Sequence, residues 1–209
     1  MRIVAISDTH EQHDQLTIPD GDVLIHAGDI TWKGSLNAIK KFAEWLQALP
    51  HKHKVIIAGN HDWCFEKSNQ AIIASEYLRH ITYLKDSNVN IDGYNFYGSP
   101  WQPEFCDWAF NLPRGGSAIK ATWDLIPYNT DVLITHGPPY GFGDMTPRGE
   151  PVGCEDLLAR VLVIKPKVHI FGHIHAGYGI SSNEDTAFIN ASICNENYKP
   201  VNAPIVYDL

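Results

Sequence analysis

Side chains that commonly bind metal ions or transfer protons gather in five short clusters along the chain. Each cluster contains Asp, His or Asn and follows a run of apolar residues. The clusters are Asp8-Thr9-His10, Gly28-Asp29, Gly59-Asn60-His61-Asp62, Thr135-His136-Gly137 and Gly172-His173-Ile174-His175. Loops at the carboxyl ends of strands in open α/β sheets converge on one crevice. We therefore expect the five clusters to meet at one site.

The residue types in these clusters favour two divalent metal ions. Carboxylate, amide and imidazole groups, with no thiolate among them, suit Mn²⁺, our first expectation, or Fe, Zn²⁺, Co²⁺ or Mg²⁺. The candidate ligands are Asp8, His10, Asp29, Asn60, His136, His173 and His175. They are too many for one ordinary site but suit two ions that share a carboxylate. Asp8 and His10 are two residues apart, as are His173 and His175, so each pair can point the same way from an extended segment.

The apolar runs before the clusters predict the strands of a layered α/β sandwich. Short β-rich runs occur at residues 3–7, 22–27, 54–58, 95–99, 131–135 and 168–172. Several are apolar on consecutive residues, which is typical of strands covered on both faces. Helical patterns occur at residues 35–49, 69–80 and 154–164, and the stretch 178–209 looks β-rich. We expect residues 1–209 to form a single α/β domain.

Composition and charge limit the class of partner. The formal net charge of −8 is opposite to that of proteins that bind a nucleic-acid backbone, so no polynucleotide partner is expected. Small phosphate esters stay possible because bound divalent cations add local positive charge. The first apolar run begins at Ile3, so we expect no signal peptide, and no stretch is long enough to span a membrane. The four cysteines form no C-x-x-C pair. We expect a cytoplasmic protein with reduced thiols.

Residues outside the clusters receive more ordinary interpretations. His26 and His169 lie inside predicted strands and are expected to be hydrogen-bonded residues of the core or of the layer behind the metal ligands. Long loops at 99–116 and 137–153 are functional segments or surface excursions. In the second loop, Arg148 is a candidate phosphate contact, and a solvated side chain is the alternative. Aromatic residues near the clusters are expected to be core residues more often than stacking partners of a base. They are Trp32, Trp63, Trp101 and Phe142.

In order and spacing, the five clusters resemble the signature of the calcineurin-like metallophosphoesterase superfamily. Further segments resemble its metallophosphoesterase-domain-containing branch. They are Pro19-Asp20-Gly21-Asp22, Gly28-Asp29-Ile30-Thr31, Thr135-His136-Gly137-Pro138-Pro139, Val152-Gly153-Cys154-Glu155, residues 172–179, Asn190-Ala191-Ser192 and the tail to Asp208-Leu209. The resemblance covers nearly the whole chain. It implies two packed β-sheets flanked by α-helices.

The resemblance also implies how the ligands divide between two metal ions. Asp8, His10, Asp29 and His175 would hold the first ion. The second would be held by Asp29, Asn60, His136 and His173, with Asp29 bridging. Some members of the branch carry Gly in place of the first His of the last motif. Here His173 is present, so the implied metal shell is complete.

The expected chemistry is hydrolysis of a phosphate ester. Two close metal ions can lower the pKa of a shared water and supply a bridging hydroxide that attacks phosphorus. His61, which is not a ligand in the family pattern, is the candidate general acid for the leaving group. Asp62 is expected to fix the tautomer of His61, and the alternative for Asp62 is a turn or helix cap. Substrate contacts are expected from Asn60, His61, His173 and Arg148.

The expected substrates are small phosphodiesters, with cyclic nucleotides as the best guess. A monoester dianion brings more charge, and Lys33 and Arg148 are the nearest cationic residues in sequence, neither adjacent to a ligand. One alternative is a phosphomonoesterase or phosphoprotein phosphatase. Another is a metal-dependent nucleotide-binding regulator with low turnover. A nuclease is disfavoured by the acidic charge.

Overall fold

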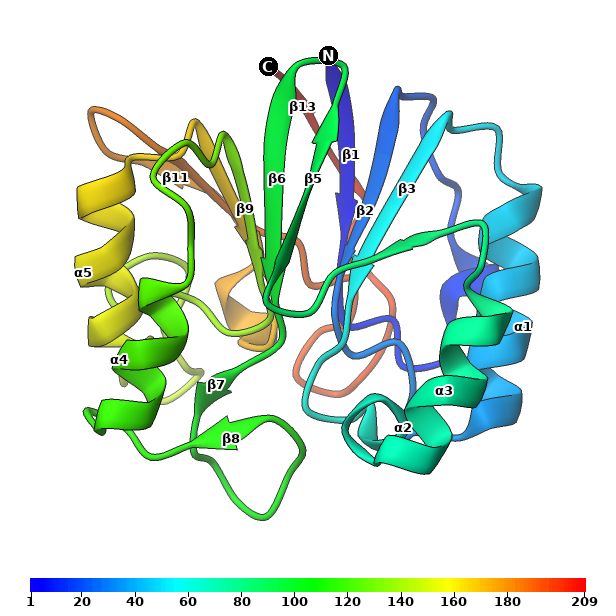
Figure 1. Cartoon of the computed structure of the whole chain (residues 1–209), viewed down its shortest axis with the longest axis horizontal. Coiled ribbons are helices and arrows are strands. Elements are labelled where there is room, and N and C mark those ends of the chain that lie inside the picture. Colours follow the sequence, from blue (N-terminus) through cyan, green and yellow to red (C-terminus); the bar gives the residue numbers. More distant parts are fainter.

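Two β-sheets form the centre of the computed structural model, which describes residues 1–209 except for the side chain of Ser68 (Figure 1). The first sheet has the strand order β13-β1-β2-β3-β4. The bounds are β1 Arg2–Ile6, β2 Val23–Ala27, β3 His53–Ile57, β4 Thr82–Tyr83 and β13 Ile205–Asp208. Strands β1 to β4 are parallel, and β13 runs antiparallel to β1. Because Ile6 pairs with His26 and Ala27 with Ile57, the carboxyl ends of β1, β2 and β3 lie level.

The second sheet has the strand order β11-β12-β10-β9-β6-β5. The bounds are β5 Ser87–Ile91, β6 Tyr94–Ser99, β9 Val132–Thr135, β10 Val168–Phe171, β11 Gly179–Ser182 and β12 Ala187–Asn190. Strands β6, β9, β10 and β12 are parallel, and the edge strands β5 and β11 are antiparallel to their neighbours. The six predicted strands are therefore all present. The β-rich character of residues 178–209 is also confirmed, in β11, β12 and β13.

Side chains from both sheets pack into one central core. Ile3 and Ile25 of the first sheet share it with Val132 and Ile170 of the second. The residues between them point to the opposite faces, where Val4 and Leu24 pack against helices. This alternation explains the consecutive apolar residues, because both faces of the central strands are covered. The predicted fold class, two sheets flanked by helices, is confirmed.

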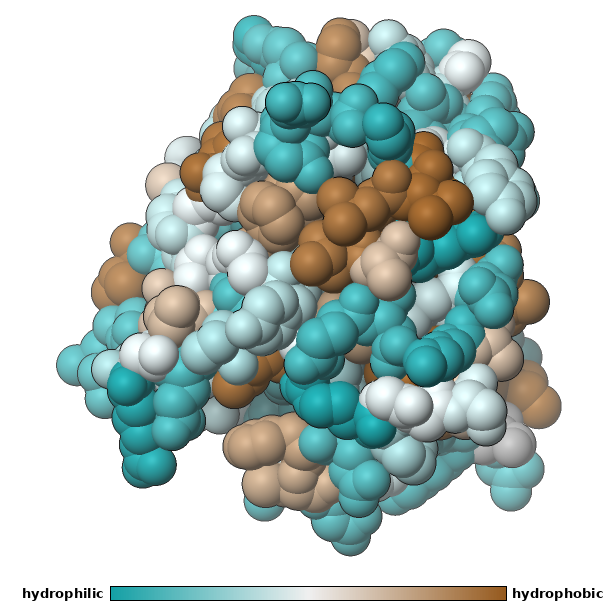
Figure 2. All heavy atoms as spheres, turned by 90° about the vertical axis from the view of Figure 1, so that its left-hand side faces the viewer, coloured by the Kyte–Doolittle hydropathy of each residue, from teal (hydrophilic) through white to brown (hydrophobic). Residues whose placement is uncertain are grey.

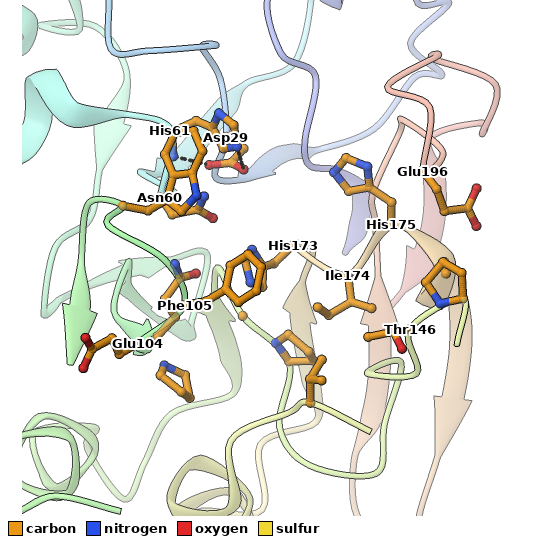
Figure 3. Close-up of a pocket in the computed structure, with 18 of the residues that line it drawn as sticks. Asp29, Asn60, His61, Glu104, Phe105, Thr146, His173, Ile174, His175 and Glu196 are labelled. Atoms are coloured by element: carbon orange, nitrogen blue, oxygen red, sulfur yellow. Dashed lines mark hydrogen bonds and ion pairs between the residues drawn. The ribbon is translucent and has the colours of Figure 1, made fainter. Parts of the chain in front are cut away.

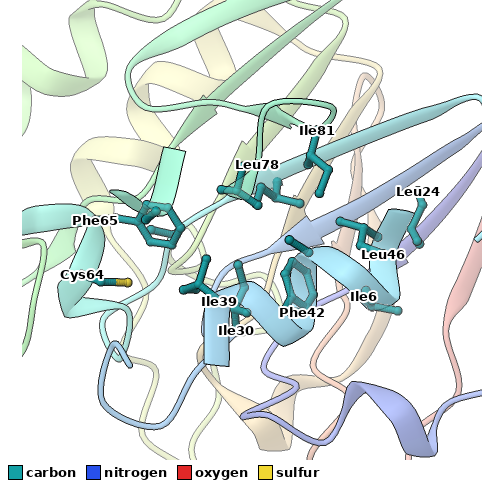
Figure 4. Packing of buried hydrophobic residues seen from close by; sticks show 14 of the residues in the cluster. Ile6, Leu24, Ile30, Ile39, Phe42, Leu46, Cys64, Phe65, Leu78 and Ile81 are labelled. Carbon is teal, nitrogen blue, oxygen red and sulfur yellow. The ribbon is translucent and has the colours of Figure 1, made fainter. Parts of the chain in front are cut away.

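Helices cover the outer faces of both sheets (Figure 1). Helices α1 (Leu36–Ala48), α2 (Trp63–Glu66) and α3 (Ser68–Tyr77) lie on the first sheet, and α4 (Ser117–Asp124) and α5 (Glu155–Ile164) lie on the second. Figure 4 shows Ile39, Phe42 and Leu46 of α1 packed toward this sheet. The Ser35 hydroxyl accepts a hydrogen bond from the Ala38 N–H, which caps α1 as its sequence predicts.

The sequence pattern did not predict two helices and the four strands β4, β5, β7 and β8. Helices α2 and α4 have only 4 and 8 residues, too few to show a clear helical period. The 3₁₀ turns η1 (His13–Gln15) and η2 (His175–Gly177) are shorter still. Strands β7 (Gln102–Pro103) and β8 (Asn111–Leu112) pair with each other inside the loop expected at 99–116. The helix expected at 69–80 is α3, which begins at Ser68 and ends at Tyr77.

The surface over α4 and α5 is a mixture of hydrophilic atoms and apolar patches (Figure 2). Leu162 and Val163 of α5 are among the exposed apolar side chains. None of the helices in the described part of the chain combines the length and the apolarity that a membrane span requires.

Candidate metal centre

The polar clusters meet at the carboxyl ends of the central strands, as expected. Asp8 follows β1, Asp29 follows β2, His136 follows β9, and His173 follows β10. The bridge between Ser7 and Ser192 joins the ends of the two sheets at this edge. These side chains from both sheets therefore form one contiguous group, which we call the floor of the site. The floor consists of Asp8, His10, Asp29, Asn60, His136, His173 and His175.

Tight backbone turns bring these side chains together. Asp8, His10, Asp29 and His173 all have positive φ, between 42° and 66°. Such conformations are uncommon for residues other than glycine and persist where the surrounding structure imposes them, often at functional sites. Here the Asp8 N–H donates to the Gly28 carbonyl at 2.9 Å, and the His10 N–H donates to the Asp29 carbonyl at 3.1 Å.

Glycines at two of these turns allow close approach of the polar groups. A Cβ atom added to Gly59 would overlap the carboxylate of Asp29, and one added to Gly172 would overlap the carboxylate of Asp8. The glycines that precede Asn60 and His173 are therefore required by space at the metal-binding edge.

The candidate ligands form two groups. In the first group, the Asp8 Oδ1 lies 3.4 Å from the His175 Nε2, which lies 3.4 Å from the His10 Nε2. The second group contains Asp29, His136 and His173. In this group, the His136 Nε2 lies 3.4 Å from the Asp29 Oδ2 and 2.9 Å from the Asn60 Oδ1. The donor atoms within each group of three lie within 4.8 Å of one another.

Asp29 connects the two groups. Its Oδ2 lies 3.9 Å from the Nε2 atoms of both His10 and His61, so these three residues form a third possible group. The carboxylates of Asp8 and Asp29 are both buried. This arrangement allows Asp29 to contact two ions at once.

The outer nitrogens of two histidines support a metal-binding orientation. The His136 Nδ1 donates to the Ala27 carbonyl and the His175 Nδ1 to the Asn195 carbonyl, both at 2.9 Å. Such bonds place the ring proton on Nδ1 and leave the lone pair of Nε2 free to bind a metal ion. They are common behind metal-ligating histidines. Buried carboxylates and oriented imidazole nitrogens together fit a borderline or hard divalent cation.

Burial and neighbouring charges shift the pKa values of several groups at the floor. Burial by itself lowers the pKa of His136, but the adjacent Asp29 carboxylate raises it to about 9. Burial lowers the pKa of His173 to about 4. For Asp8 and Asp29, burial opposes ionisation, yet the surrounding histidines hold both pKa values below the ordinary range. The floor is thus built to hold ionised carboxylates.

His61 reaches the pocket, but its partner is different from the one expected. The His61 Nδ1 donates to the Trp32 carbonyl at 2.9 Å, and its ring stacks on Trp108 with centroids 4.2 Å apart. The expectation that Asp62 fixes the tautomer of His61 is wrong, because the Trp32 carbonyl does so. The reason is the backbone turn at residues 59–62, which directs the Asp62 carboxylate away from the imidazole.

Asp62 instead organises the neighbouring loop. Its carboxylate accepts hydrogen bonds from the N–H groups of Gly59, Ile30 and Thr31 and from the Thr31 hydroxyl. Burial and the charge of Asp29 raise the pKa of Asp62 to about 6, and these donors act in the opposite direction. The turn-stabilising alternative for Asp62 therefore describes its contacts.

A cavity of about 390 Å³ opens over the floor (Figure 3). Asp29, Asn60, His61, His173 and His175 line its base. Its walls include Phe105, Trp108, Arg114, Thr146 and Tyr198. Phe105 and Trp108 come from the loop at 99–116, and Thr146 comes from the loop at 137–153. Both long loops therefore contribute to the pocket.

Arg114, and not Arg148, is the cation that lines this cavity. Arg148 is exposed and outside the lining, although Thr146 and Pro147 belong to it. The expected phosphate contact of Arg148 is thus not supported, because the loop turns its tip toward solvent. Arg114 donates to the carbonyls of Val152 and Gly153 and pairs with Glu155. These partners lie about forty residues away in the sequence, so no local pattern predicts the contacts.

Residues outside the clusters mostly follow their expected roles. The His26 Nε2 lies 2.9 Å from the Thr9 hydroxyl, and the His169 Nε2 lies 2.8 Å from the Thr135 hydroxyl, which confirms two hydrogen-bonded core histidines. Phe142 packs on Phe188. Trp32 differs from the core expectation, because it is partly exposed and stacks on His10 at 4.8 Å.

Several known proteins are similar to this chain in sequence or in fold. Residues 1–177 match the calcineurin-like phosphoesterase family, and the chain belongs to that family. It is 46% identical to metallophosphoesterase domain-containing protein 1 of Homo sapiens and to that of Mus musculus, over 100% of this chain and 71% of each relative. The crystal structure of TT1561 from Thermus thermophilus has a similar fold, with a TM-score of 0.62 and 16% identity over 90% of this chain and 88% of its own.

Membership of the family supports a coarse functional statement. The family binds a dinuclear metal centre, and membership supports metal-dependent hydrolysis of phosphate esters. Small phosphate esters are the class of substrate that the family suggests. The histidine and aspartate groups at the strand ends are the residues of this chain that could hold the metal.

Proposed function

We propose that this chain is a dinuclear metal-dependent phosphodiesterase that hydrolyses small diesters, with cyclic nucleotides as the best candidates. Asp8, His10 and His175 would hold one ion, and Asn60, His136 and His173 the other, with Asp29 shared. When bound, such ions act as Lewis acids and lower the pKa of water at the site. Mn²⁺ is the proposed native metal.

His61 is the proposed general acid. Its Nδ1–H donates to the Trp32 carbonyl, and stacking on Trp108 holds the plane of the ring. The opposite nitrogen, Nε2, lies 3.9 Å from the Asp29 Oδ2 and faces the cavity. A proton on Nε2 is therefore available to the oxygen of the leaving group. An alkoxide needs such a proton in order to depart.

Substrate binding is assigned to the base of the pocket and not to Arg148. Asn60, His61 and His173 line the cavity, where each can contact a phosphate oxygen. The Asn60 Oδ1 lies 2.9 Å from the His136 Nε2, so these two candidate ligands of the second ion lie side by side. Phe105 and Trp108 provide flat apolar surface for a base, a role that aromatic rings fill by stacking.

The charge of the pocket lining is the observation that carries the preference for diesters. Asp29, Glu104 and Glu196 line the cavity, whereas Arg114 already contacts Glu155 and two backbone carbonyls. Two divalent ions would bring four positive charges, of which Asp8, Asp29 and the attacking hydroxide would neutralise three. The remaining surplus suits a monoanionic diester, because sites for dianionic monoesters often use additional cationic side chains.

The test compares a cyclic nucleotide with its matching monophosphate at one pH and one metal concentration. We expect a higher kcat/KM for the cyclic nucleotide with metal-reconstituted protein. Full activity after chelation, with metal confirmed absent, would contradict metal dependence. More efficient hydrolysis of the monophosphate would replace this proposal by a phosphomonoesterase. Tight binding of both compounds without turnover would favour a nucleotide-binding regulator.

A further inference from the structure

Tyr198 packs against the metal-binding floor although it is not a candidate ligand. Its ring centroid lies 5.0 Å from that of His10 and 5.2 Å from that of His175, with the ring planes nearly perpendicular. The side chain lines the cavity and is 41% exposed. Its ring therefore forms the wall of the pocket beside Asp8, His10 and His175.

The backbone at Tyr198 adopts a conformation that a bulky residue rarely takes. Its φ is +56°, in the left-handed region. The Tyr198 N–H donates to the Asn195 carbonyl at 2.8 Å, and the Tyr198 carbonyl accepts from the Gln12 amide at 3.0 Å. The Asn195 carbonyl also accepts from the His175 Nδ1. The same loop thus positions a tyrosine ring and a candidate metal ligand.

Trp108 and Tyr198, at the two ends of the pocket, lie at different distances from His61. The ring of Trp108 lies 4.2 Å from that of His61, whereas the ring of Tyr198 lies 6.4 Å away. A leaving group that receives a proton from His61 would then lie beside Trp108. The other substituent of a diester would extend toward His175, where Tyr198 lines the cavity.

We propose that Tyr198 determines specificity by restricting the size of the substituent that stays on the phosphate. Its shape, and not its hydroxyl, provides this restriction, because the ring itself occupies the wall. Small or compact diesters fit, and a second bulky group is rejected. This inference rests on the proposed phosphodiesterase function.

Two diesters with the same leaving group test the restriction. Methyl p-nitrophenyl phosphate and bis(p-nitrophenyl) phosphate differ only in the substituent that remains. We expect Tyr198→Gly to raise kcat/KM for the bulky diester relative to the methyl diester by roughly tenfold, a size typical of selection by pocket shape. Tyr198→Phe should leave the ratio unchanged. An unchanged ratio in Tyr198→Gly, or a large change in Tyr198→Phe, would overturn the proposal.

Equilibrium binding separates this inference from the proposed function. Calorimetry with metal-loaded protein compares the Kd of diphenyl phosphate with that of dimethyl phosphate. Tyr198→Gly should favour diphenyl phosphate relative to wild type, even if wild type hydrolyses neither p-nitrophenyl diester. In that case the phosphodiesterase proposal fails while the steric role of Tyr198 stands. An unchanged ratio of the two Kd values overturns the steric role whatever the turnover.

A pair of variants tests whether the backbone at residue 198 is constrained. Tyr198→Ala and Tyr198→Gly remove the same ring, but only glycine adopts φ +56° without strain. We expect a Tm several degrees higher for Tyr198→Gly. Lys165, with φ +50° outside the cavity, is the matched control. Lys165→Gly and Lys165→Ala should show the same order of Tm with no change in either substrate ratio. Equal Tm values for the two Tyr198 variants would overturn the claim that tyrosine is held there against its backbone preference.

Discussion

The floor and the walls of the pocket are built differently. Floor residues such as Asp8 and His173 lie just after buried parallel strands. The Asp8 N–H donates to the Gly28 carbonyl, and the His173 N–H donates to the Asp8 carboxylate. Wall residues such as Phe105 and Arg114 lie in or beside long loops, and Phe105 is 61% exposed.

This difference predicts that the floor and the walls have different functions. Positions at strand ends have little freedom, so the floor is suited to chemistry that needs exact placement of ligands. Loops tolerate change and commonly set which ligand binds. Substitutions in the floor should therefore abolish metal binding or turnover, whereas those in the walls should mainly alter substrate affinity.

The largest effect is expected for Asp29→Asn. Because Asp29 contacts both ligand groups, both metal sites should weaken by more than the ~10–100-fold typical when a residue behind a ligand is lost. Hydrolysis should fall below detection. Elemental analysis and metal titration measure the loss, and Asp124→Asn on the exposed end of α4 is the control. A single tightly bound ion in active, fully loaded wild type would refute the shared role of Asp29.

His61→Gln should keep the metal but lose turnover. Loss of a general acid typically lowers the rate by ~10²–10⁴-fold. An aryl diester, whose leaving group needs little protonation, should lose less than an alkyl diester. Rates for both substrates, with metal content measured in parallel, provide the test. Equal losses would assign His61 a purely positional role.

Acid should destabilise the metal-free protein through two histidines beneath the floor. Burial lowers the pKa of His26 and of His169 to about 3, from an ordinary value of 6.5. The unfolded chain therefore binds protons below pH 6.5 that the folded chain takes up only near pH 3. Stability falls as the pH drops through this window, by up to roughly 1.4 kcal/mol per pH unit for each histidine.

Urea unfolding at several pH values measures this slope. His169→Gln retains a donor for Thr135 but does not titrate, so its free energy of unfolding should depend less on pH between 6.5 and 3. Other ionisable groups act equally in both proteins, and only the difference between their slopes is compared. Identical slopes would show that His169 takes up its proton without unfolding.

The smallest effects are expected in the walls. Phe105→Ala removes ring contacts of about 0.5–1.5 kcal/mol, which corresponds to a rise in KM of roughly 2–10-fold for a nucleotide substrate. Metal affinity should stay unchanged. Tyr128→Ala, which removes an exposed ring outside the cavity, is the control. A loss of metal binding in Phe105→Ala would remove the distinction between floor and walls.

Much of the floor could be predicted from the sequence. Apolar runs such as 55–57 identify buried strands, and parallel strands bring their carboxyl ends to one edge. The candidate ligands need only their positions after those runs in order to converge, and the structure places them in adjoining groups. Short helices such as α2 and α4 lack enough turns to show a period, so they escaped prediction.

The sequence by itself thus determined the layered α/β architecture and the residues that meet at its edge, because local apolar patterns and strand direction carry that information. The division into two sheets was implied by the family resemblance. Only the tertiary structure decided which groups complete the pocket. The Trp32 carbonyl, and not the adjacent Asp62, orients His61. Tyr198 reaches His10 from the opposite end of the chain. Such contacts depend on how distant loops pack, and no spacing along the chain encodes them.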